Sequence, residues 1–245
     1  MVNLIIFILL SSFGSQAKDV SATGEWRPLF NGRDTTDWEQ VGDGSFKVEN
    51  GILRSEGGMG LLYWKGGKLS DCIIRVVFRT RGVNDNSGVY VRIPMAPVEP
   101  WMPVHHSYEV QIDWKPERWG KDDRYYTGSI YSHTLPLARP PMRAAGEWNE
   151  MQITLQGART LVSLNGIKVT DFTEGDPLVR LKKDERLRHD PRPNEGFIGL
   201  QNHGPDDVVY FKDISVKSLK PDATVTETFK PLFNGKNLDG WKHVG

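Results

Sequence analysis

Phe46-Lys47-Val48-Glu49-Asn50-Gly51-Ile52-Leu53-Arg54 is the most direct sign of how this chain folds. Two short apolar runs flank the central Asn-Gly, as in two strands joined by a tight turn. Asn-Gly readily takes positive φ at both central positions, which a two-residue hairpin requires. Leu161-Val162-Ser163-Leu164-Asn165-Gly166-Ile167-Lys168-Val169 repeats the arrangement. The sequence therefore predicts two β-hairpins.

Alternating apolar and polar runs continue outward from these hairpins, and no segment shows a sustained helical period. The 25 Gly and 15 Pro residues favour a turn-rich fold over a helical one. The spacing of the runs suits an all-β, two-sheet antiparallel sandwich of the jelly-roll kind. The expected strands are Ile73–Arg79, Gly88–Ile93, Tyr108–Trp114, Asn149–Leu155, Phe197–Asn202 and Val208–Val216.

Two long segments between these runs are expected to be loops. One is Met95–His106, which contains three prolines, and the other is Asp176–Asn194, which is charged. Ordered loops of this length in a compact domain are often functional.

One motif occurs near both ends of the chain. Pro28-Leu29-Phe30-Asn31-Gly32-Arg33 returns as Pro231-Leu232-Phe233-Asn234-Gly235-Lys236, and Trp38 and Trp241 follow the two copies. A period this long is too large for a solenoid repeat. We therefore expect one domain over residues 25–219, with residues 220–245 as a linker and the truncated start of a second copy. Chance similarity between two turn-containing strands is the alternative.

The N-terminus has the pattern of a secretory signal. The apolar run Leu4–Leu10 is followed by small and polar residues through Ala17, as in the apolar region and cleavage site of a signal peptide. The run is too short to anchor the chain in a bilayer. Residues 1–17 are therefore expected to direct export to the periplasm or the medium, with no membrane attachment after removal. No Lys or Arg precedes the run, so a misplaced start is the alternative.

The balance of charges argues against a nucleic-acid partner, and the cysteine content excludes an internal disulfide. The 31 basic and 31 acidic residues balance, so the chain offers no basic excess for a nucleic acid. Cys72 is the single cysteine, which excludes an internal disulfide. Its apolar neighbours predict a small buried side chain.

Three polar side chains are expected on one face of the strand that begins at Tyr108. Alternate residues of a strand share a face, so Glu109, Gln111 and Asp113 lie together. This set suits a binding or catalytic site, and a solvated outer face is the alternative.

A second strand is expected to bring Gly88, Tyr90 and Arg92 to one face. Gly88 would let a ligand or a neighbouring chain approach closely. Arg92 would hold a carboxylate or a developing oxyanion through its fork of donors. Pairing of Arg92 with Glu109 or Asp113 across strands is a compatible alternative.

A third strand is expected to bring Gly199, Gln201 and His203 to one face. Histidine side chains in general titrate near neutral pH, which would suit His203 to general acid or base work, although a histidine at a strand end is more often a simple hydrogen-bonding group. Nearby aromatic residues would stack on sugar rings or pack in the core: Trp101, Trp114, Trp119, Tyr125, Tyr126 and Tyr131. His105-His106 and Asp122-Asp123 are candidate metal ligands, without the spacing of a closed zinc site.

Taken in order, the motifs resemble the 3-keto-disaccharide hydrolase family over residues 25–219. They are Leu29-Phe30-Asn31-Gly32 with a following Trp, Asn86-Ser87-Gly88 with Arg92, Tyr108–Asp113, Thr127–Tyr131, Gly146–Asn149, Leu164–Gly166 and Gly199–His203. The resemblance implies a concanavalin A-like jelly roll whose concave sheet carries the site. It also implies an exported bacterial protein that acts on glycosides whose C3 hydroxyl has been oxidised to a ketone.

Such glycosides can be cleaved by elimination, because the ketone acidifies the proton on C2 and the aglycone oxygen on C1 lies β to the ketone. Water addition afterwards makes the net result a hydrolysis. The route needs a base, a stabiliser for the enolate and a proton for the leaving group. We expect Glu109 or His203 as the base or as a metal ligand, Arg92 as the stabiliser and Gln111 orienting a sugar hydroxyl. The other expected substrate-binding residues are Asp113, Gln201, Tyr90, Trp101, Trp114 and Tyr131.

Elimination itself needs no nicotinamide, so a separate sugar 3-dehydrogenase is expected to supply the substrate. The sequence leaves open a divalent metal that would act as a Lewis acid on the ketone. Trp101, with Trp114 or Trp119 beside it, is expected to form one wall of the aglycone subsite. The alternative is that Trp101 packs under its own loop. A non-catalytic carbohydrate-binding module and a laminin-G-like interaction domain are the alternative functions.

Overall fold

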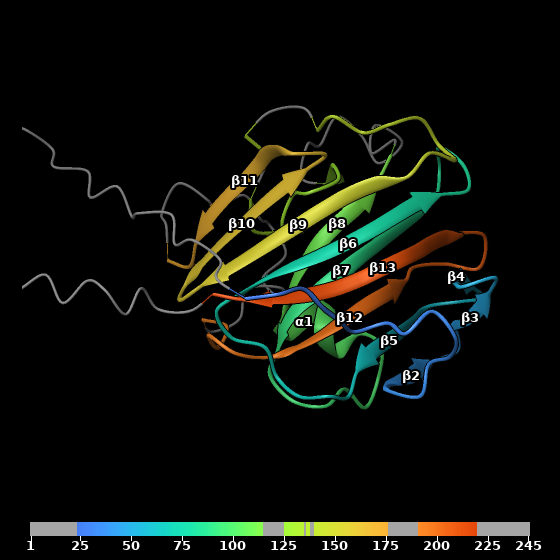
Figure 1. Cartoon of the computed structure of the whole chain (residues 1–245), viewed down its shortest axis with the longest axis horizontal. Helices are drawn as coiled ribbons and strands as arrows, with labels where there is room; N and C mark the ends of the chain where they lie inside the picture. Colours follow the sequence, from blue (N-terminus) through green and yellow to red (C-terminus); the bar gives the residue numbers. More distant parts are fainter. Residues whose placement is uncertain (1–23, 115–124, 135, 138–139, 176–190, 220–245) are drawn as a thin grey trace, which may run out of the picture. The chain divides into compact units, whose positions relative to one another are not determined.

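Two antiparallel sheets make up the described part of the protein (Figure 1). The structure, a computed structural model, describes residues 24–114, 125–134, 136–137, 140–175 and 191–219. These residues form thirteen strands and one short helix, so the prediction of an all-β two-sheet jelly roll is confirmed. Within the described ranges, no helix has the length and apolar character needed to cross a membrane.

The larger sheet has eight strands in the order β11-β10-β9-β6-β13-β4-β3, with β1 paired to β13. Its strands are β1 (Arg27–Pro28), β3 (Ser45–Glu49), β4 (Ile52–Glu56), β6 (Cys72–Thr80), β9 (Asn149–Gln156), β10 (Arg159–Leu164), β11 (Ile167–Thr173) and β13 (Val209–Ser218).

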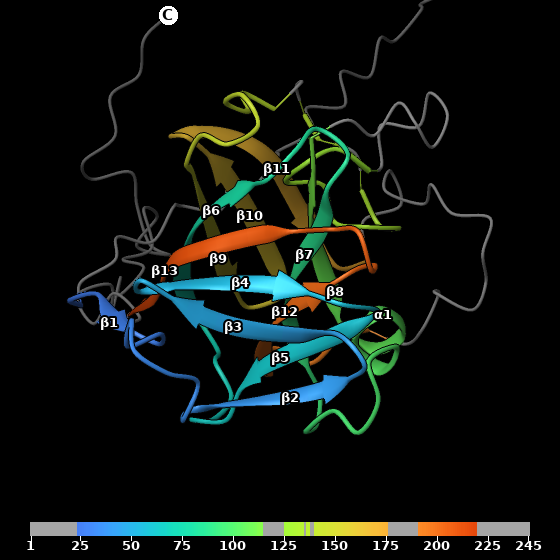
Figure 2. The ribbon, with the colours of Figure 1, turned by 90° about the vertical axis from the view of Figure 1, so that its right-hand side faces the viewer.

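The smaller sheet has five strands in the order β2-β5-β12-β7-β8. They are β2 (Trp38–Gly42), β5 (Gly60–Trp64), β7 (Asn86–Ile93), β8 (Tyr108–Asp113) and β12 (Phe197–Asn202). The helix α1 (Met102–His106) contacts β7 and β8 (Figure 2). The prediction of a loop over Met95–His106 is therefore wrong for its last five residues. Pro103 lies in the first helical turn, where its missing N–H leaves no hydrogen bond unmade.

The main hydrophobic core lies between the two sheets. Along β8, Tyr108, Val110 and Ile112 enter this core, and along β12 Ile198 and Leu200 do so. The residues between them face the other side of the smaller sheet, because strand side chains alternate. A second apolar cluster covers part of that side, formed by Leu61, Tyr63, Tyr90 and Ile93 with Met102, Val104 and Phe197 packed against it.

Both predicted hairpins are present. Asn50 and Gly51 join β3 to β4 with φ values of 51° and 80°, and Asn165 and Gly166 join β10 to β11 with 50° and 83°. Positive φ at both central positions matches the twist of the flanking strands. These turns set the register on which the eight-stranded sheet depends.

The Leu-Phe-Asn-Gly motif attaches the start of the domain to strand β13 of the larger sheet. Leu29 donates its backbone N–H to the carbonyl of Ile214 in β13, at 2.8 Å. The indole of Trp38 donates to the Leu29 carbonyl at 3.0 Å, which explains the Trp that follows the motif. The expected start of a second copy in residues 220–245 and the predicted signal in residues 1–17 lie outside the described residues.

Candidate functional site

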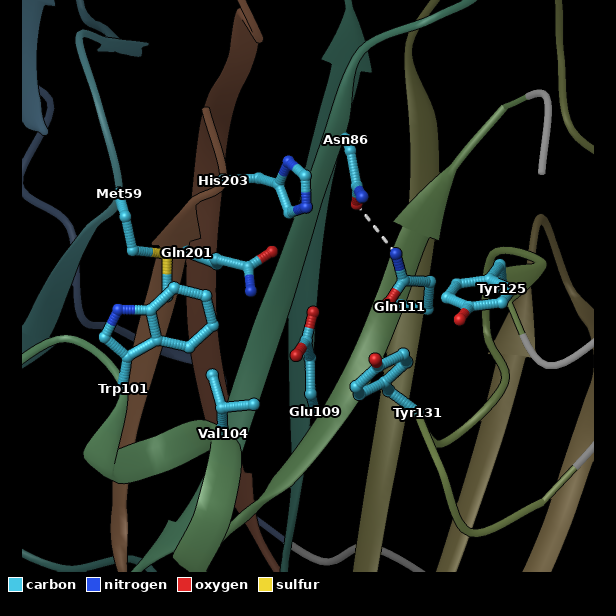
Figure 3. A pocket seen from close by; sticks show the side chains of 10 residues that line it. All are labelled: Met59, Asn86, Trp101, Val104, Glu109, Gln111, Tyr125, Tyr131, Gln201 and His203. Carbon is cyan, nitrogen blue, oxygen red and sulfur yellow. Dashed lines mark hydrogen bonds between the residues drawn. The ribbon is translucent and has the colours of Figure 1, made fainter. Parts of the chain in front are cut away.

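A pocket of about 240 Å³ lies on the face of the smaller sheet that is turned away from the main core (Figure 3). Its side chains come from strands β7, β8 and β12 with His203 just after β12, from helix α1 with Trp101 just before it, from Met59 just before β5, and from the segment 125–131. They are Met59, Asn86, Trp101, Val104, Glu109, Gln111, Tyr125, Tyr131, Gln201 and His203. Six of these are residues that the sequence nominated: Trp101, Glu109, Gln111, Tyr131, Gln201 and His203.

Glu109 fits in this pocket because the neighbouring strand carries a glycine. A Cβ atom on Gly88 would lie 2.5 Å from Glu109 Oε1 and 2.6 Å from Glu109 Cγ. Real Cβ atoms do not come that close, so the Glu109 side chain occupies the space that any other residue at position 88 would fill. The close approach expected at Gly88 is thus made by a carboxylate of the next strand.

Tyr90 lies opposite Glu109 in the β7–β8 pairing and is completely buried. Its hydroxyl accepts a hydrogen bond from Gln201 Nε2 at 2.6 Å and forms a second one with Glu109. Burial, together with the negative charge of Glu109, raises the pKa of Tyr90 well above its ordinary value. Tyr90 is not among the pocket-lining residues, so it supports two residues that are.

His203 is oriented by a carboxylate from the turn that follows β12. Its Nδ1 lies 2.8 Å from Asp207 Oδ2, and the His203 side chain is 37% exposed. The other carboxylate oxygen of Asp207 accepts the backbone N–H of Asn86 at 2.9 Å. A carboxylate at Nδ1 favours the tautomer that carries its proton on that nitrogen.

Gln111 and Asp113 share a face with Glu109 but have different surroundings. The Gln111 Nε2 donates to Asn86 Oδ1 at 2.7 Å, and Gln111 lines the pocket. Asp113 is buried and pairs with Asn86 across the strands, outside the pocket lining. Sequence reasoning missed Asn86 as a site residue and missed Asp207 altogether; the acidic turn Gly204-Pro205-Asp206-Asp207 after His203 was the available signal.

Aromatic side chains stand on two sides of the pocket (Figure 3). Trp101 lies near Met59 and is 53% exposed, so it is not packed under its own loop. Tyr125 and Tyr131 lie near Gln111, with ring centroids 5.6 Å apart. Trp114 donates its indole N–H to the Arg143 carbonyl at 2.8 Å and does not line the pocket. Trp119 lies outside the described residues.

The prediction that Arg92 shares a face with Tyr90 and Gly88 is wrong. In the β7–β12 pairing Tyr90 faces Gly199 and Ile93 faces Phe197, so two residues of β7 oppose a single residue of β12. This β-bulge, with Arg92 at a φ of 60°, re-aims its side chain.

The Arg92 guanidinium lies on the core side of the sheet, 5.9 Å from the ring centroid of Tyr108. It donates to the carbonyls of Gly157 and Arg159, the latter at 3.3 Å, and to Asn194 Oδ1 at 3.2 Å. The predicted pairing with Glu109 or Asp113 is therefore wrong as well. Arg92 therefore links the Gly157–Arg159 turn to Asn194 by hydrogen bonds and does not reach the pocket.

Metal ligands do not cluster in the described part of the chain. It contains no group of three or more His, Cys, Asp or Glu side chains placed to hold a metal ion, and His105-His106 is no exception. Asp122-Asp123 lies outside the described residues.

Cys72 is buried, as predicted, and burial raises the pKa of its thiol to about 12. A thiol with so high a pKa is not a nucleophile near neutral pH.

Known proteins with the same fold were found by comparison. A structure named "Putative glycosyl hydrolase from Parabacteroides distasonis ATCC 8503" is 26% identical, with a TM-score of 0.68 over 80% of this chain and 100% of its own. A second structure with that name and source is 24% identical, with a TM-score of 0.66 over 80% and 94%. A Bacillus subtilis protein of unknown function with a galectin-like fold is 13% identical, with a TM-score of 0.58 over 82% and 97%, and shows the fold alone. No match was found among the curated proteins.

The sequence resemblance is confirmed by a family model. The model of the 3-keto-alpha-glucoside-1,2-lyase-like domain matches residues 25–217, which include every described side chain of the pocket. The chain therefore belongs to the 3-keto-alpha-glucoside-1,2-lyase-like domain family.

Proposed function

We propose that this protein is an enzyme that cleaves 3-keto-glycosides by deprotonation at C2 and elimination of the aglycone, with net hydrolysis when water adds afterwards. The observation that carries the proposal is the meeting of Glu109 with the His203–Asp207 pair in one pocket. The family match supports the choice of 3-keto-glycosides as the substrate class.

The size of the pocket suits a single sugar ring. Its volume of about 240 Å³ is below the ~300–1,000 Å³ that is common for drug-sized ligands. The oxidised ring would therefore occupy the pocket and the aglycone would extend past its rim. The exposed face of Trp101 is available there to stack on that second group.

Glu109 is the proposed base. Its carboxylate takes the proton from C2, and the electron pair of the C–H bond forms an enolate with the C3 carbonyl. The enolate then re-forms the ketone, a C1–C2 double bond appears, and the C1–O bond breaks with its electrons on the aglycone oxygen. A base held within reach of its proton typically contributes about 10²–10⁴ in rate.

His203 is the proposed proton donor to the aglycone oxygen. Asp207 holds Nδ1 of the ring, and His203 lines the pocket, so the protonated imidazole is the proposed source of that proton. Once it has given up that proton, neutral His203 is able to activate the water that adds to C1. Protonation of C2 by Glu109 then completes the hydrolysis and restores both groups.

The enolate oxygen needs hydrogen-bond donors that stabilise its negative charge. No Lys or Arg belongs to the described pocket lining, and Arg92 is turned to the core side. The hydroxyls of Tyr125 and Tyr131 are the proposed donors, because both tyrosines line the pocket on the Gln111 side. Preorganised donors of this kind act on charge as it develops in the transition state.

We further propose that the enzyme is exported and works after a separate sugar 3-dehydrogenase, which would oxidise the C3 hydroxyl. The apolar run at the N-terminus supports export. The need for a ketone before elimination supports the order of the two reactions.

The test is turnover of 3-keto-lactose by the wild-type protein and by Glu109→Gln and His203→Ala. We expect both variants to lose about a hundredfold or more in kcat/KM, while both remain folded by circular dichroism. Mass spectrometry would separate an unsaturated keto-sugar from its hydrated form. Full activity in both variants would overturn the assignment.

Binding without turnover is the second candidate, because the exposed Trp101 and the tyrosine pair would suit a sugar-binding module as well. Glycan binding by wild-type protein that never releases the aglycone would establish that function. Absence of both binding and turnover would point to an interaction domain.

A further inference from the structure

Gln201 presents an unpaired buried oxygen within the site. The residue is 4% exposed and lines the pocket, and its Oε1 has no hydrogen-bond partner among the described residues. Its Nε2 is engaged with Tyr90. Native proteins rarely leave a buried acceptor unpaired, and the exceptions need a reason.

The orientation of this amide follows from the groups behind it. A carboxylate can only accept hydrogen bonds, so Glu109 requires Tyr90 to donate. Tyr90 has a single hydroxyl proton, so its oxygen must accept from Gln201, and the 2.6 Å contact is to the amide nitrogen. The amide oxygen then points away from Tyr90. The chain of donors thus runs from Gln201 through Tyr90 to Glu109.

Burial and packing hold this series of hydrogen bonds from Gln201 to Glu109 in place. Tyr90 is fully buried and packs with Leu61, Tyr63 and Ile93. Burial and the charge of Glu109 raise the pKa of Tyr90, so the phenol keeps its proton and remains a donor. A flipped Gln201 amide would set its oxygen against an oxygen that has no proton to offer it.

We infer that Gln201 is a specificity-determining residue whose Oε1 accepts a hydrogen bond from a free hydroxyl of the sugar ring next to the ketone, and that Tyr90 is the positioning residue that fixes this polarity. The inference rests on the proposed function for the identity of the ring. Glu109 must reach the proton on C2, and only the Tyr90 side chain stands between Glu109 and Gln201. The hydroxyl that Gln201 recognises is therefore on one of the two carbons next to the C3 ketone, C2 or C4. A carbonyl, ether or ester at that position would leave the amide oxygen unpaired.

The experiment measures whether a change in the enzyme cancels the effect of a change in the substrate, as in a double-mutant cycle. Methyl 3-keto-glucoside and its 2-deoxy, 4-deoxy and 6-deoxy analogues are compared by kcat/KM on wild-type protein and on Gln201→Met, which keeps the volume of the side chain. Wild-type protein should disfavour either the 2-deoxy or the 4-deoxy analogue by about ten- to a hundredfold. Gln201→Met should abolish that preference and leave the 6-deoxy ratio unchanged.

Tyr90→Phe tests the positioning role separately. The variant removes only the hydroxyl, so the Gln201 amide becomes free to rotate, and the same preference should fall although Tyr90 does not line the pocket. Tyr63→Phe is the matched control, because Tyr63 is a buried tyrosine of the same apolar cluster whose hydroxyl bonds to Glu39. It should keep the wild-type preference.

Binding of the unoxidised methyl glucosides, measured by calorimetry, runs the same cycle without turnover. If wild-type protein turns over no 3-keto-glycoside but binds the glucosides with the predicted preference, the proposed function fails and the role of Gln201 stands. If Gln201→Met keeps the wild-type ratios for all analogues in both assays, or if wild-type protein shows no preference in either assay, the inference is overturned.

Discussion

Replacing Gly88 by Ala tests whether the approach of Glu109 to strand β7 is needed for turnover. The added Cβ would lie 2.5, 2.6 and 2.9 Å from Oε1, Cγ and Cδ of Glu109, so the carboxylate has to leave its position. Gly88 has no positive φ, so Ala meets no backbone strain and the effect is steric.

The magnitudes separate catalysis from stability. Overpacking costs about 1–3 kcal/mol, and Ala is favoured over Gly in a strand by about 0.5–1 kcal/mol. The net loss of stability should therefore be about 2.5 kcal/mol at most, and less because the end of the Glu109 side chain can rotate aside. A catalytic group displaced by about 1 Å can lose about a hundredfold in rate, and we expect a loss of that size in kcat/KM on 3-keto-lactose.

Gly199→Ala is the matched control. Gly199 lies on the same face, in β12, and a Cβ there would lie 2.6 Å from Leu61 Cδ1 and 3.3 Å from Ile93 Cδ1. Neither contact is with a pocket residue, so this variant should lose stability and keep most of its activity. Thermal unfolding and steady-state kinetics measure both quantities. If Gly88→Ala keeps the wild-type kcat/KM, the position of Glu109 is not what the reaction depends on.

Three other predictions follow from the same site and core. Asp207→Asn keeps the shape of the side chain but removes the charge that holds His203 Nδ1, so kcat should fall and its pH profile should move; an unchanged profile would mean that Asp207 only shapes the turn. Trp101→Ala removes a side chain that is 53% exposed, so the melting temperature should barely change, whereas KM for disaccharides and aryl glycosides should rise more than KM for a methyl glycoside. Cys72, with a thiol pKa of about 12, should not react with a thiol reagent in the native protein at neutral pH and should react fully in denaturant; rapid native labelling would contradict its burial.

The fold was largely predictable because its signals are local. The two Asn-Gly turns need positive φ wherever they occur, and alternation within a strand needs only neighbours in the sequence. The expected strand Phe197–Asn202 coincides with β12, and the face expected for Glu109 and Gln111 is the face that carries the pocket. The short helix α1 was missed, inside a proline-containing segment that has too few residues to show a helical period, and strands β1, β2 and β5 were not expected from the sequence either.

The positions of Arg92 and Asp207 could not be predicted from local sequence patterns. Strict alternation puts Arg92 beside Tyr90, but a β-bulge adds one residue and sends the guanidinium to the core side. The bulge arises from how β7 pairs with β12, strands that are far apart in the sequence. Asp207 reaches His203 only because the chain turns back after β12 and holds Asp207 against the backbone of Asn86 in β7.

The sequence by itself determined the periodicity, the turns and the chemical types of the site residues, because these depend on backbone preferences and side-chain chemistry at neighbouring positions. Tertiary structure alone decided which of those residues meet. The register between β7, β8 and β12 places Tyr90 opposite Glu109 and next to Gln201, and register is the outcome of packing one whole face of each strand against the rest of the protein. The same packing leaves room over Gly88 for a carboxylate and turns Arg92 away, and no stretch of neighbouring residues contains that information.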